Sequence, residues 1–284
     1  MSAITSEPNP SSSPSKRLSF VAKMLYPKTA GMATASATAV AVSARHPGHL
    51  IASSFGRPGG EEIFLSRDRG ASWKPVLAGR AVFDPRRAPY VADTPLHWLF
   101  DIEIDPADPE HVLFTTGYGG WETHDLSSAD AGRPTHWQVL STGIEETVAL
   151  ALHSPTRGLP LASAIGDYSG FVHAGLDRPA AGNPKPPFFG NTHDVTGAEL
   201  KPELIVRVGK PRDGGAGLGY SLDGGRSWAS PAALPAPGSA AGHVAVSADG
   251  RHWVWAPLGH APHVSHDQGR RWQPCHGLMK DQRV

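Results

Sequence analysis

The chain has 284 residues, and its 26 lysines and arginines balance 26 aspartates and glutamates, so the formal net charge is zero. This balance argues against a nucleic acid or an anionic membrane as a partner, because both attract proteins through a net positive field. The 32 glycines and 27 prolines separate short apolar stretches, a composition typical of many strands joined by turns. The sequence shows no membrane span, and it favours an all-β fold in one large domain or two smaller ones.

The N-terminal 30 residues differ from the rest of the chain. The first 16 are rich in Ser and Pro, and no apolar region follows Lys16 and Arg17 at the distance typical of a signal peptide. We expect residues 1–30 to be disordered or partly ordered, with residues 17–26 as a candidate strand. The single Cys275 cannot form an internal disulfide, so the redox compartment stays undetermined.

Strand signals recur after residue 30 in units of about 45 to 60 residues, which indicates a repeat architecture. Each unit combines β-branched and aromatic residues with turns rich in Pro, Gly and Asp, and no long helix is predicted. The predicted strands fall into five groups: 37–43, 50–55 and 62–66; 98–105, 112–117 and 136–140; 147–153 and the segment 161–173; 203–209; 243–247 and 252–256. The polar, Pro-rich segment 177–200 is expected to be a long loop, either functional or disordered.

One motif, Ser-x-Asp-x-Gly-x-x-Trp, occurs three times, at Ser66–Trp73, Ser221–Trp228 and Ser265–Trp272. Its Ser and Asp can bond backbone groups of a tight turn, its Gly can adopt positive φ, and its Trp can pack between neighbouring sheets. The motif resembles the Asp-box of β-propeller proteins. We therefore expect residues 31–284 to form a β-propeller domain of four-stranded blades, with about five blades visible and the ring incomplete relative to seven. The Asp-box aspartates are expected to fold turns, and not to perform chemistry.

Three longer segments, residues 101–126, 143–171 and 188–209, resemble in order and spacing the second propeller of xyloglucan-degrading enzymes of glycoside hydrolase family 74. The most specific stretches are Gly143–Val148 and Ser163–Phe171, and the resemblance covers roughly residues 37–277. Such enzymes pair two seven-bladed propellers and cleave β-1,4-glucan backbones with inversion, using one aspartate from each propeller. The resemblance implies a polysaccharide or oligosaccharide substrate and a secreted or periplasmic location. It also implies a companion propeller, in another domain or chain, that supplies the partner aspartate.

Asp167 matches the aspartate of the second propeller, and we predict that it is the general acid. Inverting hydrolysis uses two carboxyl groups ~6.5–9.5 Å apart, one protonating the leaving oxygen and one activating water. Partial burial between small residues could raise the pKa of Asp167, whereas the alternative is that Asp167 only hydrogen-bonds a turn. Adjacent Glu145 and Glu146 would face opposite sides of a strand. Asp101, Glu103 and Asp105 would share one strand face, which we expect to be wet.

A sugar site needs aromatic platforms for the CH faces of pyranose rings and polar groups for their hydroxyls. The candidate platforms are Trp98, Tyr118, Trp121, Tyr168, Phe188 and Phe189. For Trp121 a core role is an equal alternative. Asn191 and His193 are candidates for contacts with hydroxyl groups.

Two further patterns carry less weight. The glycine-rich Gly214–Gly219 precedes a strand and an Asp-box instead of a helix, which disfavours a phosphate loop. His260, His263 and His266 lie in an extended segment where a spacing of three does not align side chains, so we predict no metal and no other cofactor.

The sequence thus supports two functions. The first is an inverting glycoside hydrolase that acts on xyloglucan or a related β-1,4-glucan, inactive where the partner aspartate is missing. The second is a non-catalytic propeller module that binds glycan or protein. An exo-sialidase is disfavoured because its arginine cluster has no counterpart among the scattered arginines.

Overall fold

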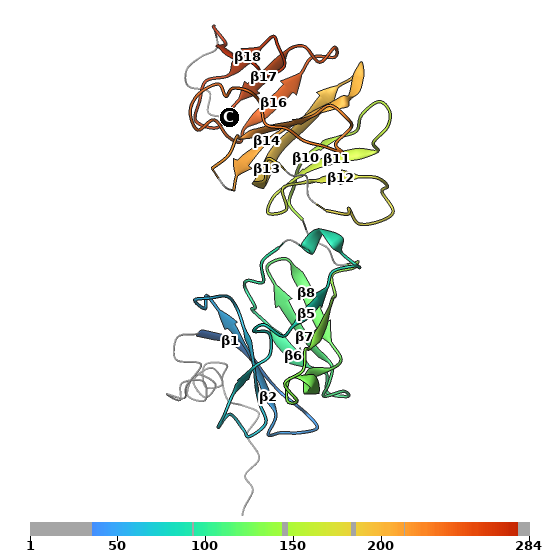
Figure 1. The fold of residues 1–284 in the computed structure, drawn as a ribbon, viewed down its shortest axis with the longest axis vertical. Coiled ribbons are helices and arrows are strands. Elements are labelled where there is room, and N and C mark those ends of the chain that lie inside the picture. The colour runs from blue at the N-terminus through green and yellow to red at the C-terminus, as the bar shows by residue number, and fades with distance from the viewer. Residues whose placement is uncertain (1–35, 93, 144–146, 183–185, 213, 278–284) are drawn as a thin grey trace, which may run out of the picture. The chain divides into compact units, whose positions relative to one another are not determined.

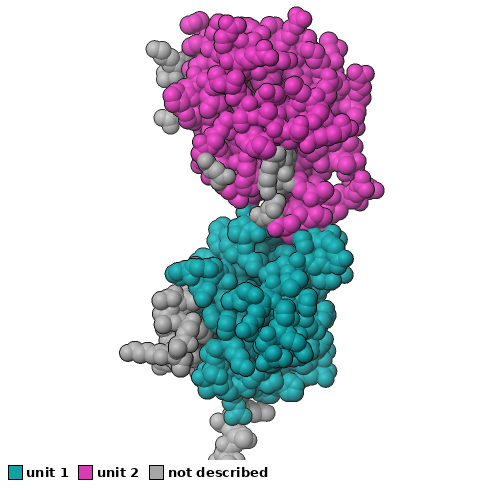
Figure 2. Space-filling view, in the orientation of Figure 1, with its two compact units in different colours: residues 1–87, 94–143 teal, residues 88–93, 144–284 magenta. Residues whose placement is uncertain are grey.

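A computed structural model of the chain describes residues 36–92, 94–143, 147–182, 186–212 and 214–277 (Figure 1). The expected N-terminal segment 1–30 lies outside the described residues. The described part contains nineteen strands and two three-residue 3₁₀ helices, which confirms the all-β prediction. Neither of these helices is long enough to cross a membrane. The chain divides into two compact units, residues 1–87 with 94–143 and residues 88–93 with 144–284 (Figure 2).

The described residues of unit 1 form two sheets. The first is antiparallel, in the order β1-β2-β3-β4, and its strands are β1 (Ser36–Val42), β2 (Leu50–Phe55), β3 (Ile63–Ser66) and β4 (Lys74–Pro75). The second has the order β5-β9-β8-β7-β6, with β5 parallel to β9. Its strands are β5 (Val82–Asp84), β6 (Ile102–Ile104), β7 (Val112–Thr116), β8 (Gly119–Thr123) and β9 (His136–Val139), and the helix η2 (Leu126–Ser128) follows β8.

In unit 2 the described residues form three antiparallel sheets and the helix η1 (Pro89–Val91). Their strands are β10 (Ala149–His153), β11 (Leu161–Ile165) and β12 (Phe171–His173); β13 (Phe189–Ala198), β14 (Lys201–Pro211) and β15 (Leu218–Ser221); β16 (His243–Val246), β17 (Trp253–Ala256), β18 (His263–Ser265) and β19 (Gln273–Pro274). The five sheets of the described residues match the five predicted blades, with three to five strands in each.

The prediction of a loop over residues 177–200 is wrong in its second half, because Phe189–Ala198 forms the ten-residue strand β13. The polar residues that disguised the strand find partners in the fold. Asp194 accepts the backbone N–H groups of Val195, at 2.9 Å, and Val244, at 3.0 Å. Irregular register at three points along β13 lets such side chains leave the regular alternation.

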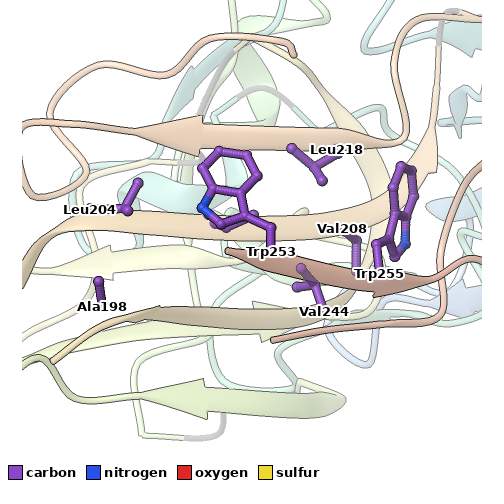
Figure 3. Close-up of a cluster of buried hydrophobic side chains, with 8 residues drawn as sticks. Ala198, Leu204, Val208, Leu218, Val244, Trp253 and Trp255 are labelled. Carbon is purple, nitrogen blue, oxygen red and sulfur yellow. The ribbon is translucent and has the colours of Figure 1, made fainter. Parts of the chain in front are cut away.

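A core cluster of unit 2 lies between the β13–β15 and β16–β19 sheets (Figure 3). Trp253 and Trp255 are fully buried there. Each indole N–H donates to a carbonyl, that of Trp253 to Gly250 at 3.2 Å and that of Trp255 to Ala241 at 2.9 Å. The two indoles therefore fill the core without leaving a polar atom unsatisfied.

The Asp-box turns have the local structure that the sequence predicts. In the first, Ser66 Oγ donates to Asp68 Oδ1 at 2.8 Å, and the same oxygen accepts the Ser72 N–H at 2.8 Å. Gly70 has φ +85°, and its carbonyl accepts the Trp73 indole N–H at 3.1 Å. The Ser-to-Asp bond, the bond from the backbone four residues beyond the Asp and the positive φ of the Gly recur in the other two copies.

Two related Ser/Thr-x-Asp patterns escaped the sequence analysis, although a turn at Asp249 and Gly250 was predicted. Between β8 and β9, Thr123 Oγ1 donates to Asp125 Oδ1 at 2.7 Å, and the same oxygen accepts the His136 N–H at 2.9 Å, across an insertion. Between β16 and β17, Ser247 Oγ donates to Asp249 Oδ1 at 2.6 Å. A Ser or Thr two residues before an Asp, with a Trp at variable distance, was the available signal. Of the five sheets described, only β10–β12 has no such turn.

Candidate functional site

The candidate site is the turn that joins β11 to β12 in unit 2. Asp167 has φ +67°, Ser169 has φ +65° and Gly170 has φ +99°. Non-glycine residues in this left-handed region cost about 1–2 kcal/mol each. A Cβ on Gly170 would collide with the carbonyl oxygen of Ser163, so the turn requires glycine there. Such a strained turn persists only where its surroundings hold it.

Strand β13 provides part of that support. The backbone N–H of Asp167 donates to Asn191 Oδ1 at 2.7 Å. The hydroxyl of Thr192 donates to the carbonyl of Ser169, and the N–H of Phe189 donates to Ser169 Oγ at 3.3 Å. The turn is therefore fixed through the backbone of Asp167 and through Ser169.

Arg207, on β14, provides the rest. Its side chain is 2% exposed and lies 4.6 Å from the ring centroids of both Phe189 and Trp228. One terminal nitrogen donates to Ser169 Oγ at 3.1 Å, and the other donates to the Pro187 carbonyl at 2.5 Å. Burial lowers the pKa of Arg207 to about 9, so the group remains a cation at neutral pH. Trp228 is the tryptophan of the second Asp-box, which links the repeated scaffold to this turn.

The side chain of Asp167 is exposed, and its carboxylate has no hydrogen bond or ion pair with any described residue. The partial burial that we expected is therefore wrong for this residue. The alternative, in which the Asp167 carboxylate hydrogen-bonds its own turn, is also wrong. The turn is bonded through the backbone N–H of Asp167, which donates to Asn191. Glu145 and Glu146 lie outside the described residues.

The other predicted residues of unit 2 have different environments. Tyr168 is 5% exposed and packs edge-on against Tyr90, with ring centroids 5.3 Å apart. Phe189 is fully buried under Arg207, so both rings support the turn and offer no open face. Phe188 is half-buried, with the guanidinium of Arg212 4.5 Å from its ring centroid.

The two polar candidates also differ from each other. The side-chain oxygen of Asn191 is occupied by the Asp167 N–H, which gives Asn191 a positioning contact. His193 is half-buried, and burial lowers its pKa, with smaller effects from His243 and Lys210. His193 is therefore neutral at pH 7 and can both donate and accept a hydrogen bond.

Unit 1 carries an exposed aromatic patch, formed by Phe55, His97, Trp98, Phe100 and Tyr118. Trp98 is 49% exposed with φ +58°, and Phe100 is 54% exposed and stacks on Phe55 with centroids 5.3 Å apart. The ring of His97 lies 4.7 Å from that of Trp98 and 4.8 Å from that of Tyr118. Sequence reasoning found Trp98 and Tyr118 but missed the two phenylalanines, which a search for aromatics near Trp98 would have included.

The loop under this patch is held by Leu99, which is fully buried. Its carbonyl accepts the hydroxyls of Thr38, at 2.7 Å, and Ser53, at 2.8 Å. Trp121, another predicted platform, is 6% exposed and packs edge-on against Phe83, so its place is in the core.

The acidic strand face is wet, as expected. Asp101 and Glu103 are exposed and Asp105 is half-buried, while the intervening Ile102 and Ile104 are buried. Gly214–Gly219 leads into β15, in agreement with the strand expected there.

Comparison with known proteins gives consistent results. A xyloglucanase from Paenibacillus sp. is 32% identical over 269 residues, which cover 86% of this chain and 26% of that protein. An oligoxyloglucan-reducing end-specific xyloglucanase from Emericella nidulans is 30% identical over 306 residues, which cover 84% of this chain and 37% of that protein. The crystal structure of the GH74 xyloglucanase from Xanthomonas campestris is similar to this chain, with 38% sequence identity and a TM-score of 0.81. The match covers 90% of this chain and 36% of the Xanthomonas chain. The chain is related to the family 74 glycoside hydrolases.

The family 74 relationship confirms the resemblance that the segments around Gly143–Val148 and Ser163–Phe171 indicated, and with it the β-propeller fold. The chain spans between 26% and 37% of the length of these family 74 relatives. A scan against protein-family models finds no match.

Proposed function

We propose that this chain carries the general-acid half of a glycoside hydrolase site that acts on xyloglucan or a related β-1,4-glucan with inversion. The observation that carries the proposal is Asp167, an exposed carboxylate on a strained turn that other residues hold. A carboxylate that the turn does not need is available to a substrate. The names of the family 74 relatives supply the substrate class.

In this mechanism the protonated carboxyl of Asp167 gives its proton to the glycosidic oxygen as the bond from that oxygen to the anomeric carbon breaks. A water molecule attacks the anomeric carbon from the opposite face and gives its proton to a second carboxylate, ~6.5–9.5 Å away. The relatives extend well beyond the part that this chain matches. We propose that a companion propeller, in a further domain or a separate chain, supplies that base.

Sugar contacts are assigned to the predicted residues that keep accessible surface. Trp98 and Tyr118, in the aromatic patch of unit 1, offer ring faces for pyranose CH groups. Phe188 and His193, in unit 2, offer a ring and a neutral hydrogen-bonding group. Tyr168, Phe189 and Asn191 support the Asp167 turn instead.

The test is the release of reducing sugar from xyloglucan by the chain, alone and mixed with the first propeller of a family 74 enzyme. We expect release by the mixture and its loss with Asp167→Asn. Asp177→Asn is the matched control, because Asp177 is also exposed and lies in the segment that follows β12. Equal release by the wild type and Asp167→Asn would remove Asp167 from the mechanism.

The alternative function is a non-catalytic module that binds glycan. The aromatic patch favours it, because exposed stacked rings bind sugars without any carboxylate. Retained binding to xyloglucan with no hydrolysis in either mixture, and loss of binding in Trp98→Ala, would support this alternative.

A further inference from the structure

Two histidines and a glutamate form a cluster on the outward face of the β5–β9 sheet in unit 1. Val112 pairs with Thr123 across β7 and β8, and Leu113 pairs with Glu122. This register places His111 beside His124, one residue beyond each strand end. Val112 and Thr123 are buried, so their sequence neighbours face the other side of the sheet.

The cluster converges on one oxygen atom. His111 Nε2 lies 3.1 Å from Glu122 Oε2, and His124 Nε2 lies 3.9 Å from the same oxygen. The other carboxylate oxygen of Glu122 faces Arg87 at 3.6 Å. One ligand atom from each of the three residues lies within 4.8 Å of the others, which is a spacing that a single ion can bridge.

A second carboxylate lies on the Nδ1 side of each imidazole. His111 Nδ1 lies 3.1 Å from Asp105 Oδ2, and His124 Nδ1 lies 3.8 Å from Asp108 Oδ2. Histidines that bind metals almost always donate the other ring N–H to a carboxylate or carbonyl, which fixes the proton on Nδ1 and leaves Nε2 as the ligand. His111 is therefore held with its Nε2 towards Glu122. For His124, Asp108 lies too far from Nδ1 for a hydrogen bond, so its ring is not fixed in the same way.

We propose that this cluster binds a divalent transition metal, with Zn²⁺ as the best fit, through His111 Nε2, His124 Nε2 and Glu122 Oε2. Two imidazoles and one carboxylate are a donor set that suits Zn²⁺, with water at the remaining position. The two rings stack face to face, with centroids 4.1 Å apart. Stacked rings do not point their Nε2 atoms at one ion, so the proposal requires the His124 ring to turn its Nε2 into the site when metal binds. Its side chain is 62% exposed and free to turn, whereas the half-buried His111 is fixed by Asp105.

Metal binding would join the ends of β7 and β8, with Asp105 extending the network towards β6. The role that follows is structural. Bound Zn²⁺ would raise the stability of unit 1 by mass action, because the unfolded chain does not hold the three ligands together. The proposal does not depend on the glycoside hydrolase assignment.

The test is calorimetric titration of ZnCl₂ into the tag-free, metal-stripped full chain at pH 7.5, together with the shift in melting temperature. We expect one equivalent of Zn²⁺ bound and a higher melting temperature. His111→Gln and His124→Gln should each weaken binding more than about tenfold, and Asp105→Asn about tenfold through the orientation of His111. If a variant fails to fold, the wild type offers a second readout. Co²⁺ bound there should show the visible absorption that is typical of a site with fewer than six ligands.

The matched control is the double variant His252→Gln/His266→Gln, which removes another close histidine pair, with Nδ1 atoms 2.8 Å apart. Unchanged binding in this variant supports the proposal. Loss of binding there, or titration curves for His111→Gln and His124→Gln that match the wild type, would overturn it.

Discussion

Two kinds of aspartate-containing turn occur in this chain, and they use the aspartate in opposite ways. In the Asp-box of residues 221–228, Asp223 binds the Ser221 hydroxyl and the Ser227 N–H, so its carboxylate builds the turn. In the turn after β11, the backbone N–H of Asp167 is bound and the carboxylate is left to solvent.

The difference lies in where the stabilising groups come from. The bonds that join the Ser, the Asp and the backbone of the Asp-box lie within eight residues, so they repeat wherever the motif repeats. The Asp167 turn takes its support from Asn191 and Thr192 on β13 and from Arg207 on β14. The carboxylate of Asp167 is free for chemistry because residues of β13 and β14 stabilise its turn. The Asp-box carboxylate is not free, because it makes the bonds of its own turn.

The strongest test of this comparison is the removal of Arg207. Arg207→Met takes away the donor to the buried Pro187 carbonyl and leaves Ser169 Oγ with the Phe189 N–H alone, so we expect the free energy of unfolding to fall by about 3 kcal/mol. Urea denaturation measures the change. Arg226→Met is the control, since Arg226 is exposed in the Asp-box and should change stability by less than about 0.5 kcal/mol. Equal stabilities of the two variants would mean that Arg207 does not hold the turn.

The next effect is on activity. Asp167→Asn should lower xyloglucan hydrolysis by the mixture with a companion propeller at least about 100-fold, because a general acid contributes that much or more. Its melting temperature should stay at the wild-type value, because the Asp167 carboxylate makes no bond to any described residue. Asp223→Asn should do the reverse, with a lower melting temperature and an unchanged turnover number. A fall in melting temperature for Asp167→Asn would place that carboxylate in the turn.

Alanine substitutions at two glycines distinguish the cost of a left-handed backbone from the cost of a steric clash at Cβ. Gly170 and Gly224 both have positive φ, at +99° and +72°, but a Cβ on Gly224 meets nothing within 4 Å. Gly224→Ala should therefore cost about 1 kcal/mol, from the left-handed backbone alone. Gly170→Ala should cost about 2 kcal/mol or more, because its Cβ also meets the Ser163 carbonyl. Thermal unfolding of both variants gives the comparison, and equal losses would show that the turn relaxes.

Local patterns and distant contacts differ in how far the sequence revealed them. The Asp-box turns were predictable because the bonds that join the Ser, the Asp and the turn backbone all lie within eight residues. Asp167 was found through the motif around it, but its support was not, since Arg207 lies 38 residues from Ser169 in the chain. Strand β13 was missed because Asn191, His193 and Asp194 look like loop residues until the partners of Asn191 and Asp194 are known. The turn from Thr123 to Trp137 was hidden by its insertion.

The smallest predicted effect is the loss of stability at low pH. The hydrogen bond from the Ser227 hydroxyl, followed by that from its backbone N–H, lowers the pKa of Asp223 to about 2, below the value of about 3.9 typical of an unfolded chain. A lowered native pKa adds stability above the unfolded value, and this contribution is lost as pH falls from about 4 to about 2.

The melting temperature of the wild type should therefore approach that of Asp223→Asn over this range, having exceeded it at pH 7. Asp68 and Asp267, whose pKa values are also lowered to about 2, should behave in the same way. A gap between wild type and Asp223→Asn that stays constant from pH 7 to pH 2 would mean that the Asp-box stabilises the turn through shape alone, and the contrast between the two kinds of turn would lose its electrostatic part.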